Sequence, residues 1–243
     1  MLCKEGSFPI KGFIETSFID WKGCLSSVVF SGGCNFRCPF CHNSNLVLHH
    51  NEMENIPLDY IIPTLKKYRD WVDRVVITGG EPTIHDSLLE AIKEIKKEGI
   101  LVKLDSNGSS PSVLKMLANE GLIDYIAMDV KGPLKRYERW CGVKVDIEKI
   151  EESIQFIMES HIDYEFRMTV VPFFHREEDV YEVAEYIRNA KRFYIQEFQP
   201  KNTLNPSFSN ITPFSPEKVE KIRVKVSQIL TNNNQRSQCL SSE

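Results

Sequence analysis

Six short runs of β-branched and aromatic residues recur along the chain, and each is followed by a stretch with helical periodicity. Most of these runs end in a loop that is polar or contains glycine. A repeat of this kind predicts parallel strands joined by right-handed crossovers. We therefore expect an α/β fold, a partial (β/α)6 barrel of the TIM type that is two units short of closure and open on one side. The predicted strands are residues 27–30, 74–78, 101–105, 125–131, 165–172 and 193–200.

The chain has 243 residues, of which 42% are hydrophobic, enough for one large core. We expect a single domain over residues 1–231, in which residues 1–25 add a strand or hairpin. Helical patterns are predicted near residues 58–68, 86–99, 111–120, 147–160, 177–189 and 216–230. Residues 232–243 are polar, and we expect a disordered tail there.

The formal net charge of −4 argues against a general nucleic-acid binder, which carries a basic excess. No run of eighteen apolar residues occurs, so no membrane span is expected. We expect a cytoplasmic protein, because the chain has no disulfide pattern. We also expect a monomer when the protein is free.

Three of the seven cysteines, Cys34, Cys38 and Cys41, are spaced C-x3-C-x2-C directly after the first predicted strand. Gly32 and Gly33 precede them, so three thiolates within eight residues can converge on one small inorganic centre. A cubane iron–sulfur cluster normally takes four cysteines, and three ligands leave one iron open for chemistry. The loop lies at a strand's carboxyl end, where α/β folds place their sites. This pattern favours a catalytic centre over a structural one.

Two other interpretations of the cysteines are weaker. A zinc site could add His42, but this residue is adjacent to Cys41, and no second C-x2-C pair follows. A disulfide framework conflicts with the odd number of cysteines and with the absence of a signal-peptide pattern. The sequence assigns no role to the other four cysteines, Cys3, Cys24, Cys141 and Cys239.

Later strand ends carry further candidates. Gly79 and Gly80 allow a close backbone approach to a ligand, and Glu81 can accept a hydrogen bond from an ammonium group. Asp105 and Asp129 end successive strands, where carboxylates can bind ribose hydroxyls or a cation. The alternative for Gly79 and Gly80 is an ordinary turn, and the alternative for Asp105 and Asp129 is that they cap the helices that follow.

Basic residues accompany these acids. Lys131 lies two residues after Asp129 and so faces the same side, as a countercharge. Arg167 lies in an apolar strand and needs an anionic partner there. His175 is expected to be a loop residue. Residues 132–143 are basic and aromatic and form a candidate contact for a protein partner.

Several of these segments resemble a known family. Cys34, Cys38 and Cys41, with Phe40 before the last cysteine, resemble the signature of the radical S-adenosylmethionine (SAM) superfamily. Cys41-His42-Asn43 and Gly79-Gly80-Glu81-Pro82 are similar to the activating enzymes of glycyl radical enzymes. The resemblance covers about residues 10–230. It is greatest to activating proteins of anaerobic ribonucleoside-triphosphate reductases, with pyruvate formate-lyase activating enzymes as near relatives.

The resemblance implies one [4Fe–4S] cluster on the three cysteines and SAM at its open iron. A flavodoxin- or ferredoxin-type donor would reduce the cluster, and SAM would be cleaved to a 5′-deoxyadenosyl radical. The radical would take a hydrogen atom from a glycine of a partner glycyl radical enzyme. The resemblance also suggests a monovalent cation near Asp105 and Asp129. The residues implied in cofactor binding are Phe40, His42, Gly79, Gly80, Glu81, Asp105, Asn107, Asp129, Lys131, Arg167 and Asn202.

One position separates the two groups of activating enzymes, since the pyruvate formate-lyase type carries a histidine where this chain has Asn202.

Two rival functions stay open. One is a radical SAM enzyme that modifies a small molecule or a tRNA base. The other is a non-enzymatic iron–sulfur or zinc-binding interaction module, which the strand-end glycines and acids contradict.

Overall fold

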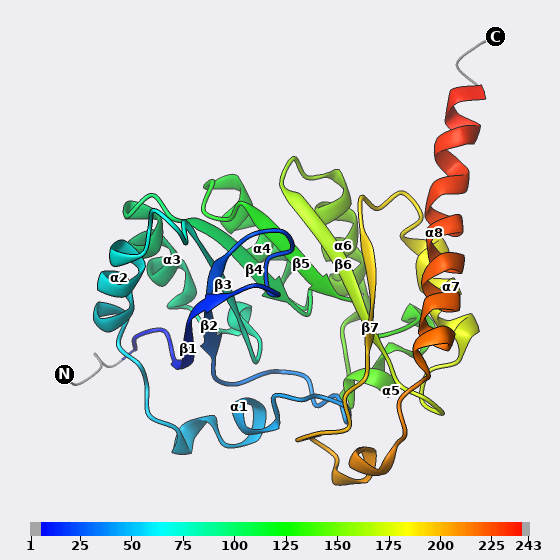
Figure 1. Ribbon diagram of the computed structural model, residues 1–243, viewed down its shortest axis with the longest axis horizontal. Coiled ribbons are helices and arrows are strands. Elements are labelled where there is room, and N and C mark those ends of the chain that lie inside the picture. The colour runs from blue at the N-terminus through cyan, green and yellow to red at the C-terminus, as the bar shows by residue number, and fades with distance from the viewer. Residues whose placement is uncertain (1–5, 240–243) are drawn as a thin grey trace.

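The computed structural model describes residues 6–239, and of residues 232–239 only the backbone. The chain forms one sheet of seven strands in sequence order, with helices packed on its outer face (Figure 1). The strands are β1 (Ile10–Ser17), β2 (Ser26–Ser31), β3 (Arg74–Gly79), β4 (Leu101–Ser106), β5 (Tyr125–Asp129), β6 (Asp163–Val170) and β7 (Phe193–Glu197).

Strands β2 to β7 are all parallel, and β1 pairs antiparallel with β2. The six parallel strands confirm the predicted α/β fold and the partial TIM-type barrel. Among the described strands, β1 and β7 are the two ends of the sheet and do not pair with each other. The barrel is therefore open between β1 and β7.

The helices follow the strands as the repeat predicts, and four short 3-10 helices lie in the connections. Pro111 and Pro216 are the first residues of α4 and α8, where proline's fixed φ and missing N–H cost nothing. The helices are α1 (Ser44–Leu48), α2 (Leu58–Lys67), α3 (Leu88–Lys97), α4 (Pro111–Asn119), α5 (Tyr137–Cys141), α6 (Ile147–Glu159), α7 (Glu177–Tyr186) and α8 (Pro216–Cys239). The 3-10 helices are η1 (His50–Glu52), η2 (Pro82–Ile84), η3 (Leu134–Arg136) and η4 (Pro206–Asn210).

The two faces of the strands differ in chemistry, because successive side chains point to opposite sides. On β4, Val102 and Leu104 are fully buried in the core between sheet and helices. Lys103 and Asp105, on the opposite face, point into the barrel and are also buried. The helices therefore cover an apolar outer face, and the inside of the barrel is polar and charged.

The connection between β1 and β2 closes the barrel at the amino ends of the parallel strands. Lys103 Nζ donates to the Asp20 carbonyl oxygen over 2.6 Å. The Trp21 ring lies 5.6 Å from that of Tyr125, and Lys22 Nζ lies 3.3 Å from the Tyr194 hydroxyl. Figure 1 shows this dark-blue connection crossing in front of the sheet. The open side is thus bridged at one end and remains open toward the other.

The last helix runs farther than the sequence predicts. α8 continues to Cys239 instead of ending near Leu230, so residues expected in a disordered tail have helical backbone. Extending an existing helix adds one backbone hydrogen bond per residue and does not require an apolar face. Residues 240–243 lie outside the described part, as does Cys3. None of the described helices is both long and apolar enough to span a membrane.

Candidate active site

The cysteine loop leaves the carboxyl end of β2 and is fastened to the end of β3. The Glu81 N–H donates to the Gly33 carbonyl oxygen over 2.8 Å, and the Gly80 N–H donates to that of Ser31 over 2.9 Å. A Cβ on Gly80 would lie 1.8 Å from the Gly33 oxygen. The glycines thus allow a close backbone approach, as predicted, but the approaching partner is the cysteine loop itself.

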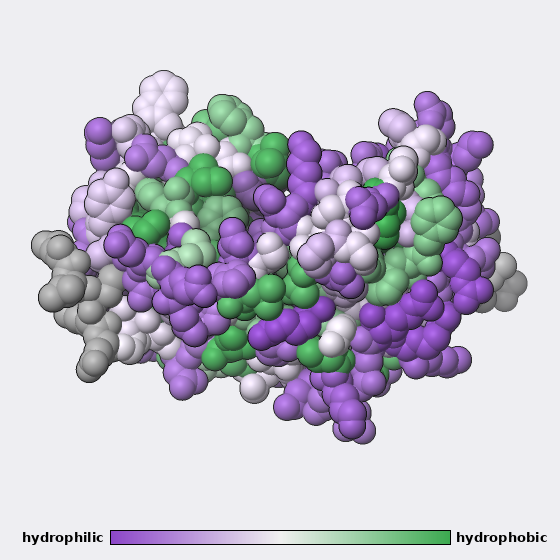
Figure 2. All heavy atoms as spheres, turned by 90° about the horizontal axis from the view of Figure 1, so that it is seen from below, coloured by the Kyte–Doolittle hydropathy of each residue, from purple (hydrophilic) through white to green (hydrophobic). Residues whose placement is uncertain are grey.

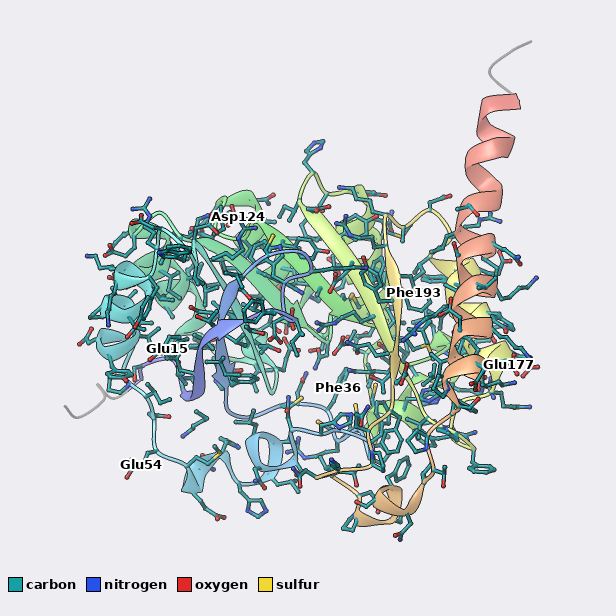
Figure 3. The ribbon with its side chains drawn as sticks, in the orientation of Figure 1. Glu15, Phe36, Glu54, Asp124, Glu177 and Phe193 are labelled. Atoms are coloured by element: carbon teal, nitrogen blue, oxygen red, sulfur yellow. The ribbon has the colours of Figure 1, made fainter. Side chains whose placement is uncertain are left out.

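A cavity of about 550 Å³ opens beside this loop, inside the carboxyl ends of the strands. Figure 3 shows Phe36, a buried residue of the loop, close to these strand ends. The cavity extends inward to Ile19 and Asp20 of the β1–β2 connection. Of the residues predicted at the site, the lining includes Cys34, Cys38, Phe40, Cys41, His42, Gly79, Gly80, Glu81, Asp105, Asn107, Asp129, Lys131 and Arg167.

Asn202 is the one predicted site residue outside this lining. It is exposed and has a φ of +52°, in the left-handed region that asparagine tolerates. The chain turns there and runs back along the cysteine loop. The Leu204 N–H donates to the Cys41 carbonyl oxygen over 3.0 Å, and the Asn205 N–H to that of Pro39 over 2.9 Å. This segment therefore supports the loop from outside the cavity.

The three cysteines lie in different electrostatic surroundings. Burial raises the pKa of Cys34 to about 12, and it also raises the pKa of Cys41. A hydrogen bond from the Cys141 side chain lowers the pKa of Cys38. Cys141 itself is fully buried at the end of α5. The sequence missed this contact, because about 100 residues separate the two cysteines and no spacing rule connects them.

The spacing of the candidate ligands distinguishes a single metal ion from an iron–sulfur cluster. In the described part of the chain, no three His, Cys, Asp or Glu side chains are grouped closely enough to hold one metal ion. A zinc site needs four donors around one ion, so the zinc alternative with His42 does not fit. A cubane cluster binds each thiolate through a different iron, and its ligands stand farther apart. Three cysteines lining one cavity suit such a cluster.

Glu81 is almost fully buried, and its carboxylate joins two strand ends. It accepts hydrogen bonds from the Thr83 N–H and hydroxyl, from the Ser106 hydroxyl and, over 2.6 Å, from the Asn107 N–H. Burial raises its pKa, and the four donors oppose that rise. An ammonium group of a ligand would therefore share a carboxylate that already accepts four hydrogen bonds.

Arg167 links the two predicted strand-end acids inside the barrel. Its Nη1 lies 2.9 Å from an Asp105 carboxylate oxygen and its Nε 2.8 Å from one of Asp129. Lys131 Nζ lies 3.1 Å from the other Asp129 oxygen. Burial opposes ionisation of Asp129, but the two cations outweigh it and lower its pKa to about 2. Lys131 is thus the countercharge that the strand periodicity predicts.

A second layer of charges lies deeper in the barrel. Lys103 Nζ is 3.2 Å from Glu165 and 3.7 Å from Asp105 Oδ1. That Asp105 oxygen is buried and accepts no hydrogen bond from the described residues. Because Arg167 already neutralises Asp105 and Asp129, a cation between them would compete with its guanidinium. The cation stays a prediction.

Residues 132–143, predicted as a partner contact, lie largely beneath the cysteine loop. Tyr137, Trp140 and Cys141 are buried, because α5 packs its apolar side against the loop. The Arg37 N–H donates to the Cys141 carbonyl oxygen over 2.8 Å. α5 ends at Gly142, which has a φ of +68° and lies so close to Arg37 that a Cβ would be 2.2 Å from its carbonyl oxygen.

His175 is also buried, and the prediction of a loop residue understates its contacts. Its ring stacks on Trp140 with a centroid separation of 5.6 Å. Nδ1 accepts from the Val171 N–H over 3.1 Å, and Nε2 lies 2.9 Å from the Lys131 carbonyl oxygen, which requires the neutral tautomer with the proton on Nε2. Burial lowers the pKa of His175 to about 4.

This histidine makes stability depend on pH. The pKa of His175 is 6.5 in the unfolded chain and about 4 in the folded chain. The neutral, buried imidazole therefore contributes fully to the free energy of unfolding above pH 6.5. This contribution is lost as the pH falls from 6.5 to 4. The loss amounts to about 3 kcal/mol. We expect chemical denaturation of His175→Gln to show a shallower loss over this window than the unsubstituted protein. Equal slopes would contradict this assignment.

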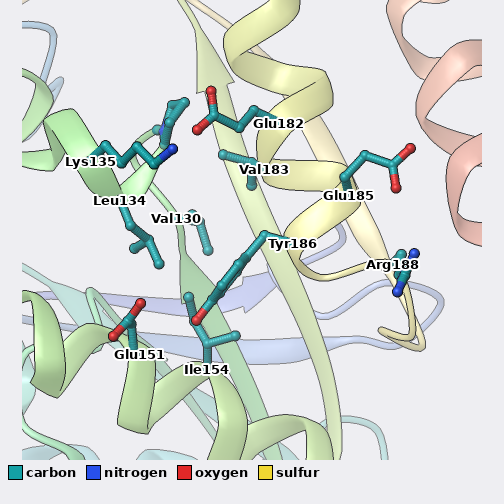
Figure 4. Close-up of a pocket in the computed structure, with 12 residues that line it drawn as sticks. Val130, Leu134, Lys135, Glu151, Ile154, Glu182, Val183, Glu185, Tyr186 and Arg188 are labelled. Carbon is teal, nitrogen blue, oxygen red and sulfur yellow. The ribbon is translucent and has the colours of Figure 1, made fainter.

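A second cavity of about 450 Å³ lies away from the cysteines (Figure 4). It is bounded by α6, α7 and the segment after β5, with Ile154, Tyr186 and Leu134 around it. Figure 4 shows acidic and basic side chains at its rim, with Arg188 at the far end of α7. None of the predicted catalytic or cofactor-binding residues lines this cavity, although the first residues of the predicted partner contact, 132–135, do.

Comparison with known proteins bears on this site. The family model described as Radical SAM superfamily matches residues 28–188, a span that includes the cysteine loop and the strand ends from β2 to β6. The chain belongs to the radical SAM superfamily. Members of this superfamily are enzymes that use a [4Fe–4S] cluster and SAM, so membership implies both cofactors for this chain.

Two relatives in this superfamily differ in how much of the chain they match. A Methanocaldococcus jannaschii protein named "Putative glycyl-radical enzyme activating enzyme" is 32% identical over 212 residues, which cover 83% of this chain and 85% of the relative. A Thermococcus kodakarensis protein named "Probable GTP 3′,8-cyclase" is 31% identical over 129 residues, covering 51% of this chain and 41% of the relative.

Two solved structures share the fold at low sequence identity. Streptococcus suis SuiB bound to S-adenosylmethionine superimposes with a TM-score of 0.65 at 17% identity, covering 85% of this chain and 47% of SuiB. TYW1 with a lysine-pyruvate adduct gives a TM-score of 0.58 at 18% identity, over 86% of this chain and 73% of that one. The chain thus spans less than half of SuiB, and these likenesses concern the fold alone.

Proposed function

We propose that this radical SAM enzyme activates a glycyl radical enzyme. It would cleave SAM reductively to a 5′-deoxyadenosyl radical that takes a hydrogen atom from a glycine of the partner, an anaerobic ribonucleoside-triphosphate reductase. The match to the M. jannaschii protein carries the proposal, because it extends over most of both chains. The match to the GTP 3′,8-cyclase covers only part of each.

The residues of the site fit the two cofactors. Cys34, Cys38 and Cys41 would hold the cluster, which supplies the electron for SAM cleavage when bound. Gly79 and Gly80 lie on the cavity wall beside them. Lys131 and Arg167 supply positive charge for a carboxylate. The chain's own part is to orient these groups and to keep the site away from bulk water.

The open side of the barrel suits a protein substrate. β1 and β7 stay unpaired with each other in the described sheet, and Gln196 of β7 and Phe30 of β2 line the cavity near this gap. An extended loop of a partner can enter where two more strands would close a full barrel. A structure of SuiB bound to its precursor peptide SuiA shares the fold with a TM-score of 0.65, which supports peptide access in this architecture.

Electron paramagnetic resonance on a mixture with an anaerobic ribonucleoside-triphosphate reductase tests the proposal. The reconstituted, reduced protein with SAM should produce a glycyl radical doublet on the reductase. A reductase in which the radical glycine is replaced by alanine is the matched control and should give none. If the doublet is absent while GTP is consumed in the presence of SAM, the enzyme acts on a small molecule and the proposal is wrong.

A further inference from the structure

Four exposed arginines surround α5 on the outer side of the cysteine loop. They are Arg37 in the loop, Arg136 and Arg139 next to and within α5, and Arg176 before α7, and we call them the arginine face. None of the four lines the cavity that holds the cysteines. Figure 2, seen from the side of α1 and α5, shows hydrophilic side chains predominating over the half that carries α5 and α7.

Contacts through Trp140 hold the arginine face together. The guanidinium carbons of Arg136 and Arg139 lie 5.7 and 5.9 Å from the Trp140 ring centroid. The Trp140 ring stacks on His175, the residue before Arg176. The Arg37 backbone is hydrogen-bonded to Cys141, the residue after Trp140. The four arginines therefore lie on segments that meet at Trp140, and the Arg37 guanidinium is itself held by the carbonyl oxygens of Cys34 and Phe36 in the cysteine loop.

Three of the four arginines have no ion pair with a described residue. Of the four, Arg136 alone forms one, with Asp179 at 2.7 Å. The exposed acids nearest to them in sequence are Glu138 and Glu178, so the arginines outnumber the exposed acids on this face; Glu182 and Glu185 of α7 are also exposed but line the second cavity, as does Lys135. This local excess contrasts with the net charge of −4 for the whole chain. Arginine forms two-pronged hydrogen bonds with carboxylates and is enriched at interfaces, so the face suits an acidic protein.

The position of the arginine face relative to the cysteines suggests the role of the acidic partner protein. On the cavity side, SAM and the substrate occupy the approach to the cluster. On the other side, α5 lies directly against the ligand loop, since the Arg37 N–H, next to Cys38, donates to the Cys141 carbonyl oxygen over 2.8 Å. An electron donor must come close to the cluster without entering the occupied cavity, and the α5 side offers that approach.

We propose that an acidic one-electron donor protein docks on the arginine face and reduces the cluster from the α5 side. This inference rests on the radical SAM activity and deepens the proposed function by placing the donor. One electron leaves the donor and one enters the cluster, as when a flavodoxin hydroquinone becomes a semiquinone, and no covalent bond forms or breaks.

Association of the holoenzyme with reduced flavodoxin, and separately with a reduced ferredoxin, tests the docking site. For the donor that binds the unsubstituted protein, we expect the association rate constant of Arg139→Glu/Arg176→Glu to fall at least about tenfold at low ionic strength. Added salt should slow association of the unsubstituted protein and so bring its association rate constant closer to that of the double variant. An unchanged rate constant in the variant, or failure of both donors to bind the unsubstituted protein, would overturn the proposal.

The matched control reverses two exposed cations at helix carboxyl ends, away from the cluster. Lys97→Glu/Arg188→Glu changes the net charge by the same amount, and Figure 4 shows Arg188 beyond the end of α7. Its association rate constant should stay within about twofold, since only local charge guides docking. An equal loss in both double variants would attribute the effect to net charge and contradict a defined docking face.

Chemical reduction of the cluster distinguishes a defect in donor docking from a defect in SAM cleavage. With dithionite in place of the donor protein, Arg139→Glu/Arg176→Glu should cleave SAM as fast as the unsubstituted protein, because dithionite needs no docking surface. A matching loss with dithionite would place the damage at the cluster and sink the proposal. Failure to form a glycyl radical, with donor association still dependent on the arginines, would count against the activase function alone.

Discussion

Replacing Arg167 with methionine is expected to lower the free energy of unfolding by about 3–5 kcal/mol, because the change leaves buried carboxylates without their partner. The Arg167 side chain is only 14% exposed, and Asp105, which it pairs with, is 9% exposed. Methionine preserves much of the volume and none of the charge. Chemical denaturation at neutral pH measures the difference.

The pH dependence of Arg167→Met stability, a compensating variant and a control variant show whether unpaired charge causes the loss. The deficit of Arg167→Met should shrink as the pH falls, because the unpaired carboxylates then take up protons in the folded state. Combining it with Asp105→Asn and Asp129→Asn should restore part of the loss. Lys66→Met removes the ion pair of exposed Lys66 with Glu98 and should change stability by less than about 0.5 kcal/mol. A deficit that is independent of pH would contradict this electrostatic explanation.

Replacing Gly80 with alanine should disconnect the cysteine loop from the end of β3. The new Cβ would overlap the Gly33 carbonyl oxygen, and backbone atoms cannot rotate away as a side chain can. Overpacking of this kind costs about 1–3 kcal/mol or more. We expect the dissociation constant for SAM to rise at least about tenfold, as measured by equilibrium binding to the reconstituted protein.

Gly121→Ala is the matched control, because Gly121 lies outside the cavity lining and a Cβ there would meet no atom within 4 Å. Its φ of +65° makes alanine unfavourable there, so this variant is also destabilised, but away from the site. SAM binding should be unchanged in Gly121→Ala. If Gly80→Ala bound SAM as well as Gly121→Ala does, the close approach of the two loops would have no function.

Local periodicity predicts much of this fold and site, because it determines which way a strand side chain points. Asp129 and Lys131, two residues apart, share a face and pair as expected. The strand-end positions of Gly80 and Asp105 follow from the same repeat. These features depend on a few neighbouring residues, and a sequence displays them directly.

Features that depend on distant partners were not predictable in this way. The Cys141 contact with Cys38 and the burial of Trp140 arise because α5 folds back under a loop far away in sequence. The composition of that segment, rich in arginine and aromatic residues, indicated an exposed interface, and its arginines are in fact exposed. Asn202 lies outside the cavity because its left-handed turn redirects the chain, which no side-chain pattern reveals.

Formation of 5′-deoxyadenosine from SAM tests most directly whether Cys34, Cys38 and Cys41 form the catalytic centre. After anaerobic reconstitution with iron and sulfide and reduction, the unsubstituted protein should show a [4Fe–4S] spectrum and release 5′-deoxyadenosine. Cys24→Ala, at a cysteine that contacts Arg74 away from the cavity, should retain both properties. Cys38→Ala should lose both, and a Cys38→Ala protein that still makes 5′-deoxyadenosine would contradict the assignment of the site.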